Sequence, residues 1–246
     1  MSKVLSIDLD WILGDCISLY NDLVRGNIPM LELWEEIERE RHCESFLSYD
    51  KAHLEQLKKL VVKLKPSQVY WGNDHSSIIL AIKDAMDKKI ISAPFVLYNI
   101  DHHHDINYSP QQEEAVDKYD VANCGSWIAY LNKYELIDEY FWIKNKYSTD
   151  YHGQKQFSPK RQEIELKKQD TLNFLFNEDF DIIYITSSDC YIPPKFYNIL
   201  DDFKKMVLYY YPNLIDYENQ TSHGTMVYTS NYFNNCKGVN KYNEYS

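Results

Sequence analysis

The chain of 246 residues has few of the features that mark membrane-bound, secreted or zinc-ribbon proteins. No apolar run approaches the ~20 residues that a membrane-spanning helix needs. The opening residues Met1–Leu5 do not begin the apolar stretch of a signal peptide. Five cysteines are scattered along the chain with no Cys-x-x-Cys pair, which argues against a disulfide framework and a structural zinc site. We therefore expect a cytoplasmic protein with no membrane partner.

Basic residues are in the minority, with 26 Lys and Arg against 37 Asp and Glu and a net charge of −11. Phosphate binding requires a basic face, so we expect no nucleic-acid partner. The acidic balance is compatible with a cationic substrate, and equally with simple solubility. The 22 tyrosines would suit a peptide-binding surface, although a biased codon usage would also explain them.

Short apolar runs alternate with helical patterns, which is typical of an α/β fold. The predicted strands are Val4–Leu9, Gln68–Trp71, Phe95–Ile100 and Ile182–Thr186, with Met206–Tyr210 and Thr225–Tyr228 as further candidates. The predicted helices are Ile28–Phe46, Lys51–Leu64, Ser76–Lys88 and Gly125–Tyr134, with Asp50 and Ser76 as N-caps. Residues 144–170 are predicted to form a loop or flap before a helix that ends near Phe176, and a polar tail starts at about residue 231. No repeat or linker divides the chain, so we expect one domain over residues 1–246.

A run of histidines between two aspartates follows the apolar segment Pro94–Leu97, and it occupies Asp101–Asp105. If the strand continues, Asp101, His103 and Asp105 share one face while His102 and His104 point elsewhere. Two carboxylates and one imidazole suit a divalent cation, and no thiolate lies nearby in the sequence. The alternative is a polar surface turn.

Other predicted strands also end in residues that can bind a metal. Asp8 and Asp10 share a face of the first strand, and two adjacent buried carboxylates repel one another unless a cation neutralises them. The alternative is one capping and one surface aspartate. His75 follows the second strand, where Gly72 allows a tight turn, although a lone histidine is more often structural.

Ligands of open α/β sheets bind beyond the carboxyl ends of the strands. Asp189 follows the strand Ile182–Thr186, and the prolines Pro193 and Pro194 hold the chain just beyond it. Asn123 and Ser126 stand at a predicted helix start, where they suit substrate hydrogen bonds or ordinary N-capping.

Taken together, these motifs resemble those of the arginase/deacetylase (ureohydrolase) superfamily, in the branch that includes peptide arginases. Gly72–Ser76 is similar to the family's Gly-Gly-Asp-His-Ser, with Asn73 for the second glycine. Asp101–Asp105 resembles its Asp-Ala-His-x-Asp, and Ser6–Asp10 resembles its Ser-Phe-Asp-Val-Asp. In arginases the last motif lies downstream of the second, whereas here it opens the chain. The chain therefore looks circularly permuted.

The resemblance implies an arginase-like α/β fold, a three-layer sandwich with a mostly parallel central sheet. It also implies two Mn²⁺ ions, or other divalent metals. His75 and Asp105 would bind one ion, and His103 and Asp10 would bind the other. Asp8 and Asp101 would contact both ions.

The activity that the resemblance implies is hydrolysis of arginine guanidinium groups to ornithine and urea, on an arginine-containing precursor peptide made by the ribosome. Asp105 would carry the proton to the leaving amine, and Asp101 would be essential as the shared ligand. Asp189 would hold the guanidinium, with Glu218 and Asp74 as further candidates. Residues 123–126 lack the histidine that arginases specific for free arginine carry in this segment, which favours a larger substrate. Asn123 and Ser126 would contact it.

Three alternatives remain open on the sequence. A haloacid-dehalogenase-type phosphohydrolase would use Asp8 as nucleophile and Asp10 as acid/base with Mg²⁺, and Asp201-Asp202 could imitate its later acidic pair. That interpretation leaves both His75 and His103 without a role. A deacetylase or other amidohydrolase could use the same metal scaffold, and a peptide-binding protein could retain a vestigial site. The sequence leaves the oligomeric state open.

Overall fold

The computed structural model describes residues 1–14, 34, 39, 48–148, 166–169, 171–188, 191–218 and 226–227. The predicted helix Ile28–Phe46 lies outside the described residues apart from Trp34 and Arg39, which are both helical. Asp189 and the tail from residue 231 also lie outside them.

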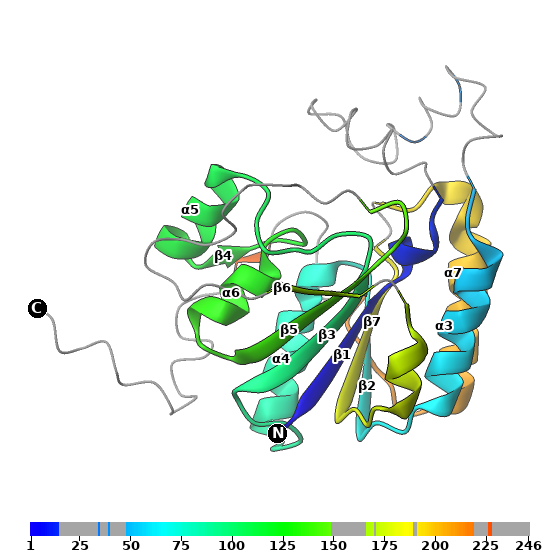
Figure 1. Cartoon of the computed structure of the whole chain (residues 1–246), viewed down its shortest axis with the longest axis horizontal. Helices are drawn as coiled ribbons and strands as arrows, with labels where there is room; N and C mark the ends of the chain where they lie inside the picture. Colours follow the sequence, from blue (N-terminus) through cyan, green and yellow to red (C-terminus); the bar gives the residue numbers. More distant parts are fainter. Residues whose placement is uncertain are drawn as a thin grey trace, which may run out of the picture.

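A central sheet of seven parallel strands organises the described chain, in the order β6-β5-β3-β1-β7-β2-β8 (Figure 1). Its strands are β1 (Lys3–Asp8), β2 (Gln68–Gly72), β3 (Phe95–Asp101), β5 (Ile137–Lys144), β6 (Leu166–Gln169), β7 (Ile182–Thr186) and β8 (Ile215–Asp216). A separate antiparallel pair joins β4 (Val121–Ala122) to β9 (Met226–Val227). The predicted α/β class and the mostly parallel sheet are confirmed.

Helices cover both faces of the sheet (Figure 1). The α-helices are α3 (Lys51–Lys63), α4 (Ile78–Asp87), α5 (Pro110–Tyr119), α6 (Trp127–Lys133) and α7 (Tyr197–Tyr210). The 3₁₀ helices are η1 (Leu9–Ile12), η3 (His75–Ser77), η4 (Asn173–Asn177) and η5 (Pro194–Phe196). None of the described helices combines the length and the apolar character that crossing a membrane requires.

The alternating side chains of β1 separate two hydrophobic cores. Leu5 and Ile7 pack into the core beneath α3 and α7, whereas Val4 packs into the core beneath α4 and α6. The helix α3 contributes a stripe of buried residues at helical spacing, Leu54, Leu57, Leu60 and Val61. Both faces of β1 and its neighbours are therefore buried, as expected for parallel strands.

Several predicted boundaries agree with the structure, and others are wrong. The predicted N-cap Asp50 accepts hydrogen bonds from the backbone N–H groups of Ala52 and His53. Ser76 is not an N-cap, because Asp74 caps η3 and Ser77 precedes α4. The predicted strand Met206–Tyr210 is the end of α7, whose buried residues Leu200, Phe203 and Val207 recur at helical spacing.

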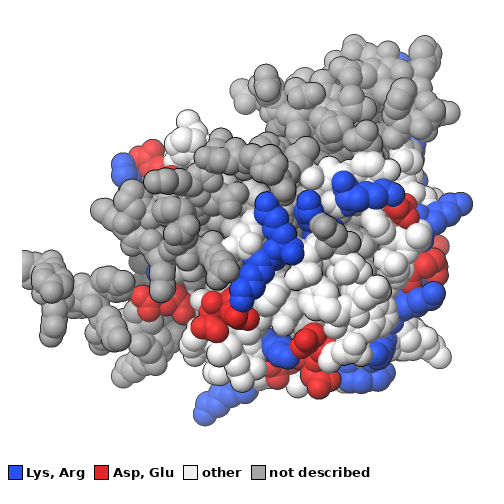
Figure 2. Space-filling model, in the orientation of Figure 1, with Lys and Arg blue, Asp and Glu red and all other residues white. Residues whose placement is uncertain are grey.

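The segment predicted as a loop or flap at residues 144–170 contains the edge strand β6. The helix expected to end near Phe176 is the single 3₁₀ turn η4. On the described part of the face in Figure 2, acidic and basic side chains stand side by side. Ion pairs among the described residues include Lys3–Glu178 and Lys167–Glu139.

Candidate metal centre

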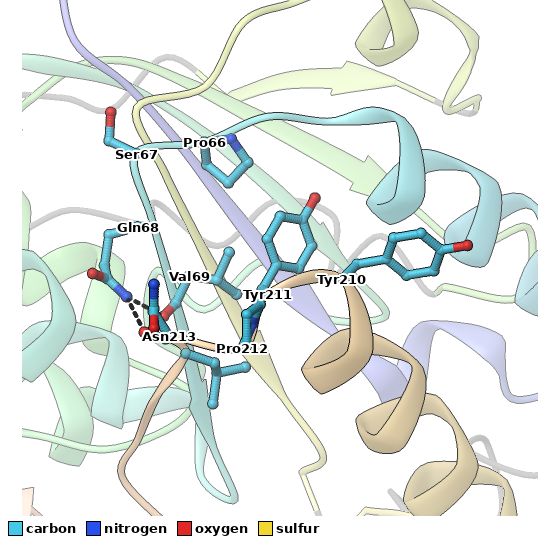
Figure 3. A pocket seen from close by; sticks show the side chains of 9 residues that line it. Pro66, Ser67, Gln68, Val69, Tyr210, Tyr211, Pro212 and Asn213 are labelled. Carbon is cyan, nitrogen blue, oxygen red and sulfur yellow. Dashed lines mark hydrogen bonds between the residues drawn. The ribbon is translucent and has the colours of Figure 1, made fainter.

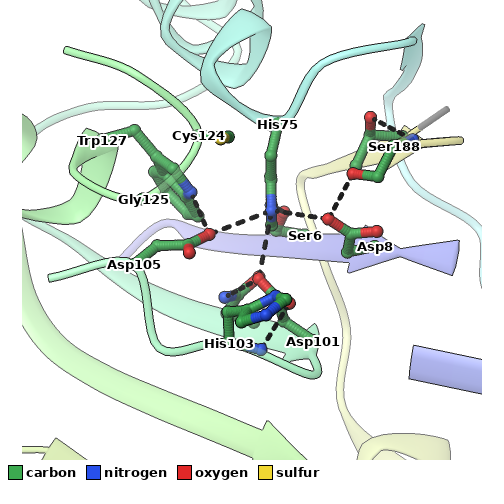
Figure 4. Close-up of polar contacts among 12 residues, drawn as sticks. Ser6, Asp8, His75, Asp101, His103, Asp105, Cys124, Gly125, Trp127 and Ser188 are labelled. Carbon is green, nitrogen blue, oxygen red and sulfur yellow. Dashed lines mark hydrogen bonds and ion pairs between the residues drawn. The ribbon is translucent and has the colours of Figure 1, made fainter. Parts of the chain in front are cut away.

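Acidic and imidazole side chains meet at the carboxyl ends of β1, β2 and β3 (Figure 4). Two groups of three bring their ligand atoms within 4.8 Å of one another: Asp8 with His75 and Asp101, and Asp10 with Asp101 and His103. Asp101 belongs to both groups. Parallel strands place their carboxyl ends at the same edge, which explains why segments far apart in the sequence meet here.

His75 lies at the centre of the first group. Its Nδ1 atom is 3.1 Å from each of three carboxylate oxygens: Oδ2 of Asp8, Oδ2 of Asp101 and Oδ2 of Asp105. The imidazole ring is 1 % exposed. Figure 4 shows the three carboxylates arranged around this one nitrogen.

The second group is centred on Asp10 and His103. Oδ2 of Asp10 lies 3.0 Å from Nδ1 of His103, and Oδ1 of Asp101 lies 3.7 Å from the same nitrogen. Asp101 therefore turns one oxygen to each histidine. The side chain of His103 is 14 % exposed, more than those of the other residues in the two groups.

The donor set fits a divalent cation. Nδ1 of His75 and Oδ2 of Asp10 are buried and have no hydrogen-bond partner of acceptable geometry among the described residues. In the part of the chain that the structure describes, the ion-pair partners of Asp8, Asp10, Asp101 and Asp105 are His75 and His103, with no lysine or arginine among them. Buried carboxylates without a cationic side chain are costly, and oxygen with imidazole ligands suits Mn²⁺, Mg²⁺ or Zn²⁺.

The pKa values of these groups reflect the same cost of burying carboxylates close together. Burial, followed by repulsion from Asp105 and Asp8, raises the pKa of Asp101 to about 7. Burial also raises the pKa of Asp8 and of Asp10. Burial lowers the pKa of His103, but the carboxylates led by Asp10 outweigh it and raise the pKa to about 9. Without a metal ion, the cluster retains protons that a cation would replace.

Hydrogen bonds from neighbouring residues orient the acidic and imidazole side chains. Ser6 Oγ lies 2.7 Å from Nε2 of His75, and Ser188 Oγ donates to Oδ2 of Asp8. Asn99 Nδ2 donates to Oδ2 of Asp101 over 3.0 Å. These contacts were not predicted from the sequence, although strand alternation places Ser6 on the face of Asp8 and Asn99 on the face of Asp101. Trp127, which was not predicted either, donates its indole Nε1–H to Oδ2 of Asp105 over 2.7 Å.

The strand alternation predicted for residues 101–105 is wrong, because β3 ends at Asp101. The chain then turns, and Asp105 adopts a left-handed φ of 53° that returns its carboxylate toward His75. His102 and His104 belong to neither group of ligand atoms, and both are buried, at 4 % and 2 % exposed. The ring of His102 lies against that of His103, with 5.2 Å between the centroids. Burial and the neighbouring His103 lower the pKa of His102 to about 2.

The predicted substrate-contacting residues are only partly placed. Asp189 lies outside the described residues. Asn123 and Ser126 bond to each other and to their own turn: Asn123 Oδ1 accepts from Gly125 N and Ser126 Oγ. Ser126 Oγ also accepts from the backbone N–H of Asn123.

The further candidates for guanidinium binding are both engaged elsewhere. Asp74 Oδ1 accepts from the backbone N–H of Ser76. Glu218 accepts from the indole of Trp71 and pairs with Lys204, each over 2.7 Å.

A hollow of about 270 Å³ lies at the opposite end of β2 from His75, lined by residues 66–69 and 210–214 (Figure 3). Among its lining side chains, Gln68 donates its Nε2 group to the carbonyl oxygens of Val69 and Asn213. The Tyr211 hydroxyl lies within hydrogen-bond distance of the carbonyls of Val61 and Leu64. None of the six acidic and imidazole residues lines it.

Comparison of the chain with family models, with curated proteins and with solved structures gives no match.

Proposed function

We propose that the protein is a dinuclear-metal hydrolase that cleaves arginine guanidinium groups of a peptide to ornithine and urea. The observation that carries the proposal is the position of Asp101, which belongs to two buried Asp/His groups at once. A carboxylate shared in this way is the arrangement expected for two neighbouring ions. The arginase-like three-layer sandwich and the cytoplasmic location are part of the proposal, and helices on both faces of the sheet support the former.

The residues that would hold the ions are Asp8, His75, Asp101 and Asp105 for one, and Asp8, Asp10, Asp101 and His103 for the other. Four carboxylates among six ligands favour Mn²⁺ over Zn²⁺. When bound, two divalent ions supply Lewis acidity and lower the pKa of a water molecule to near neutral pH.

Asp105 is the residue proposed to carry a proton to the leaving amine. Its Oδ2 atom faces His75 and accepts the indole N–H of Trp127. The carboxylate is thus held in a fixed orientation beside the proposed ions, where it could move a proton to the leaving group.

The phosphohydrolase alternative is less well supported. It gives His75 and His103 no role, yet both lie within 3.1 Å of the aspartates that it would use. The later acidic pair Asp201 and Asp202 is exposed on α7, where Asp202 pairs with Lys205. Deacetylation and other amide hydrolysis remain outcomes for the experiment to separate.

The experiment combines metal analysis with a urea assay. We expect close to two Mn²⁺ per chain, and urea from arginine-containing peptides in preference to free arginine. Asp101→Asn should lose both metal and urea formation, whereas Asp202→Asn on the exposed face of α7 should keep both. Metal-loaded protein that forms no urea from either substrate would overturn the guanidinium proposal. Hydrolysis of a phosphate monoester or an acetyl-lysine peptide would assign one of the alternatives instead.

A further inference from the structure

The segment Asn123–Trp127 packs directly against the metal centre (Figure 4). Its first residues form a closed turn, in which Asn123 and Ser126 bond to each other. The backbone N–H of Ile128 donates to the carbonyl oxygen of Asp105 over 3.2 Å. The turn and the start of α6 are therefore attached to the loop that carries Asp105.

Trp127 fixes the side chain of Asp105. Its ring is completely buried, and its Nε1–H donates to Oδ2 of Asp105 over 2.7 Å. The same oxygen lies 3.1 Å from Nδ1 of His75. The indole ring also lies against the imidazole of His75, with 4.8 Å between the ring centroids. The side chain of Trp127 thus contacts both Asp105 and His75.

Tyr108 fixes the backbone of Asp105. Its hydroxyl oxygen accepts two hydrogen bonds, from the N–H of His104 over 2.7 Å and from the N–H of Asp105 over 3.0 Å. Asp105 has the left-handed φ of 53°, a conformation that costs energy for a residue with a side chain. Tyr140 adds a hydrogen bond from its hydroxyl to the carbonyl oxygen of His104. These hydrogen bonds hold Asp105 in its left-handed conformation.

Gly125 belongs to the segment that carries Trp127, and it lies next to Tyr108. A Cβ atom at this position would lie 2.9 Å from the ring of Tyr108 and 2.9 Å from Nε2 of Gln112. Gln112 itself accepts the backbone N–H of Tyr108. The absence of a side chain at Gly125 therefore permits Tyr108 to sit where its oxygen reaches the loop.

We infer that Trp127 and Tyr108 are positioning residues that hold Asp105 in its metal-binding orientation, and that the Asn123–Trp127 segment serves this purpose. The inference rests on the metal centre of the proposed function and not on the identity of the substrate. Groups that hydrogen-bond to metal ligands set the orientation of those ligands, and their loss typically weakens metal binding about 10–100-fold.

The first test is spectroscopic and uses the full chain with Zn²⁺, which is diamagnetic. The indole N–H signal of Trp127 is identified by its loss in Trp127→Phe. We expect this signal to shift as Zn²⁺ is added, because its acceptor oxygen becomes a metal ligand. The indole signal of Trp71, which donates to Glu218, is the internal reference and should not shift.

The second test measures Zn²⁺ affinity in three variants. Trp127→Phe removes the indole donor, Tyr108→Phe removes the phenol acceptor, and Gly125→Ala displaces Tyr108 while leaving both side chains intact. Each should bind Zn²⁺ about 10–100-fold more weakly than the wild type. Tyr70→Phe, which removes a phenol bonded to Asp84 on α4, is the matched control and should bind as tightly as the wild type.

The outcomes separate this inference from the proposed function. If the wild type binds metal, an unmoved Trp127 signal with unchanged affinity in the three variants would overturn the positioning role, even if their melting temperatures fall. If the wild type binds no metal, both the proposed metal centre and this inference are contradicted. Metal binding with the expected shift but without urea formation supports the positioning role and overturns only the guanidinium chemistry.

Discussion

The hydroxyl oxygen of Ser6 lies 2.7 Å from Nε2 of His75. When Nε2 donates its proton to this hydroxyl, Nδ1 presents a lone pair to the oxygens of Asp8, Asp101 and Asp105. Lone pairs that face one another repel, and a cation placed among them removes the repulsion. The contact on the far side of the ring is thus compatible with the imidazole form that binds metal, and it fixes the orientation of the ring.

Ser6→Ala should weaken metal binding about 10–100-fold, since the ring loses the partner that fixes its orientation. Isothermal titration of the metal-free protein with Mn²⁺ measures this directly. Ser109→Ala, which removes the N-cap of α5, is the control: it should cost about 1 kcal/mol of stability and leave the affinity unchanged. Equal affinity in Ser6→Ala and the wild type would contradict the role of Ser6.

Asp101→Ala should abolish both metal binding and activity, because it removes the oxygen atoms that face each histidine. His102→Ala should retain most of the metal, since the contact of His102 with Asp10 is made by its backbone N–H. The loss of its buried ring should still cost about 1–3 kcal/mol of stability. Metal content after gel filtration distinguishes the two, and substantial metal loss in His102→Ala would refute the assignment.

The metal-free protein should lose stability as the pH rises. Asp101 has a folded pKa of about 7, above the unfolded value near 3.9, so the folded state binds more protons between these limits. His103, with a folded pKa of about 9, continues the trend upward from about pH 6.5. Each group contributes a slope of at most about −1.4 kcal/mol per pH unit in its window.

Urea unfolding between about pH 5 and pH 9, in a chelator and in excess Mn²⁺, measures this slope. Bound metal replaces the protons, so the stability in Mn²⁺ should rise with pH relative to the metal-free protein. Asp101→Asn should flatten the lower part of the metal-free curve. A metal-free slope that is the same in this variant and the wild type would contradict the assignment.

Gly72→Ala should disturb the metal centre from a distance. The added Cβ would clash with the hydroxyl of Tyr184, which donates to the carbonyl oxygen of Asp74, the residue before His75. We expect a loss of about 1–3 kcal/mol in unfolding free energy and weaker Mn²⁺ binding. Tyr184→Phe on the Gly72→Ala background should recover part of the stability if the clash is the cause.

The sequence was sufficient to predict β1, β2, β3 and β7 to within two residues, because each is a short apolar run buried on both sides. It also identified the six residues that the structure brings together, since aspartates and histidines after such strands must meet at one edge. Five of them form two groups of three that share Asp101, and Asp105 lies 3.1 Å from His75. The division of these residues between two ions stays a prediction.

Other helices, strands and turns could not be predicted, because the sequence shows no clear apolar pattern for them. The helix α5 buries Val116 as its single buried residue and so shows no apolar stripe. The strand β5 begins with half-exposed and exposed residues, including Asp138, which conceal its alternation. The left-handed turn at Asp105 depends on Tyr108 and Trp127, and contacts between such residues cannot be read from spacing along the chain.

The central place of β1 has a consequence for how the protein assembles. Val4 pairs with Leu97 on one side and with Ile182 on the other, so the middle of the sheet joins segments separated by most of the chain. Pairings of this kind make folding slow and leave apolar strands unpaired during synthesis. Because β7 lies between β1 and β2, the segment Ile182–Thr186 separates the strands that carry Asp8 and precede His75. The proposed metal site would therefore be complete only after β7 has been inserted, so metal binding would report a late stage of folding.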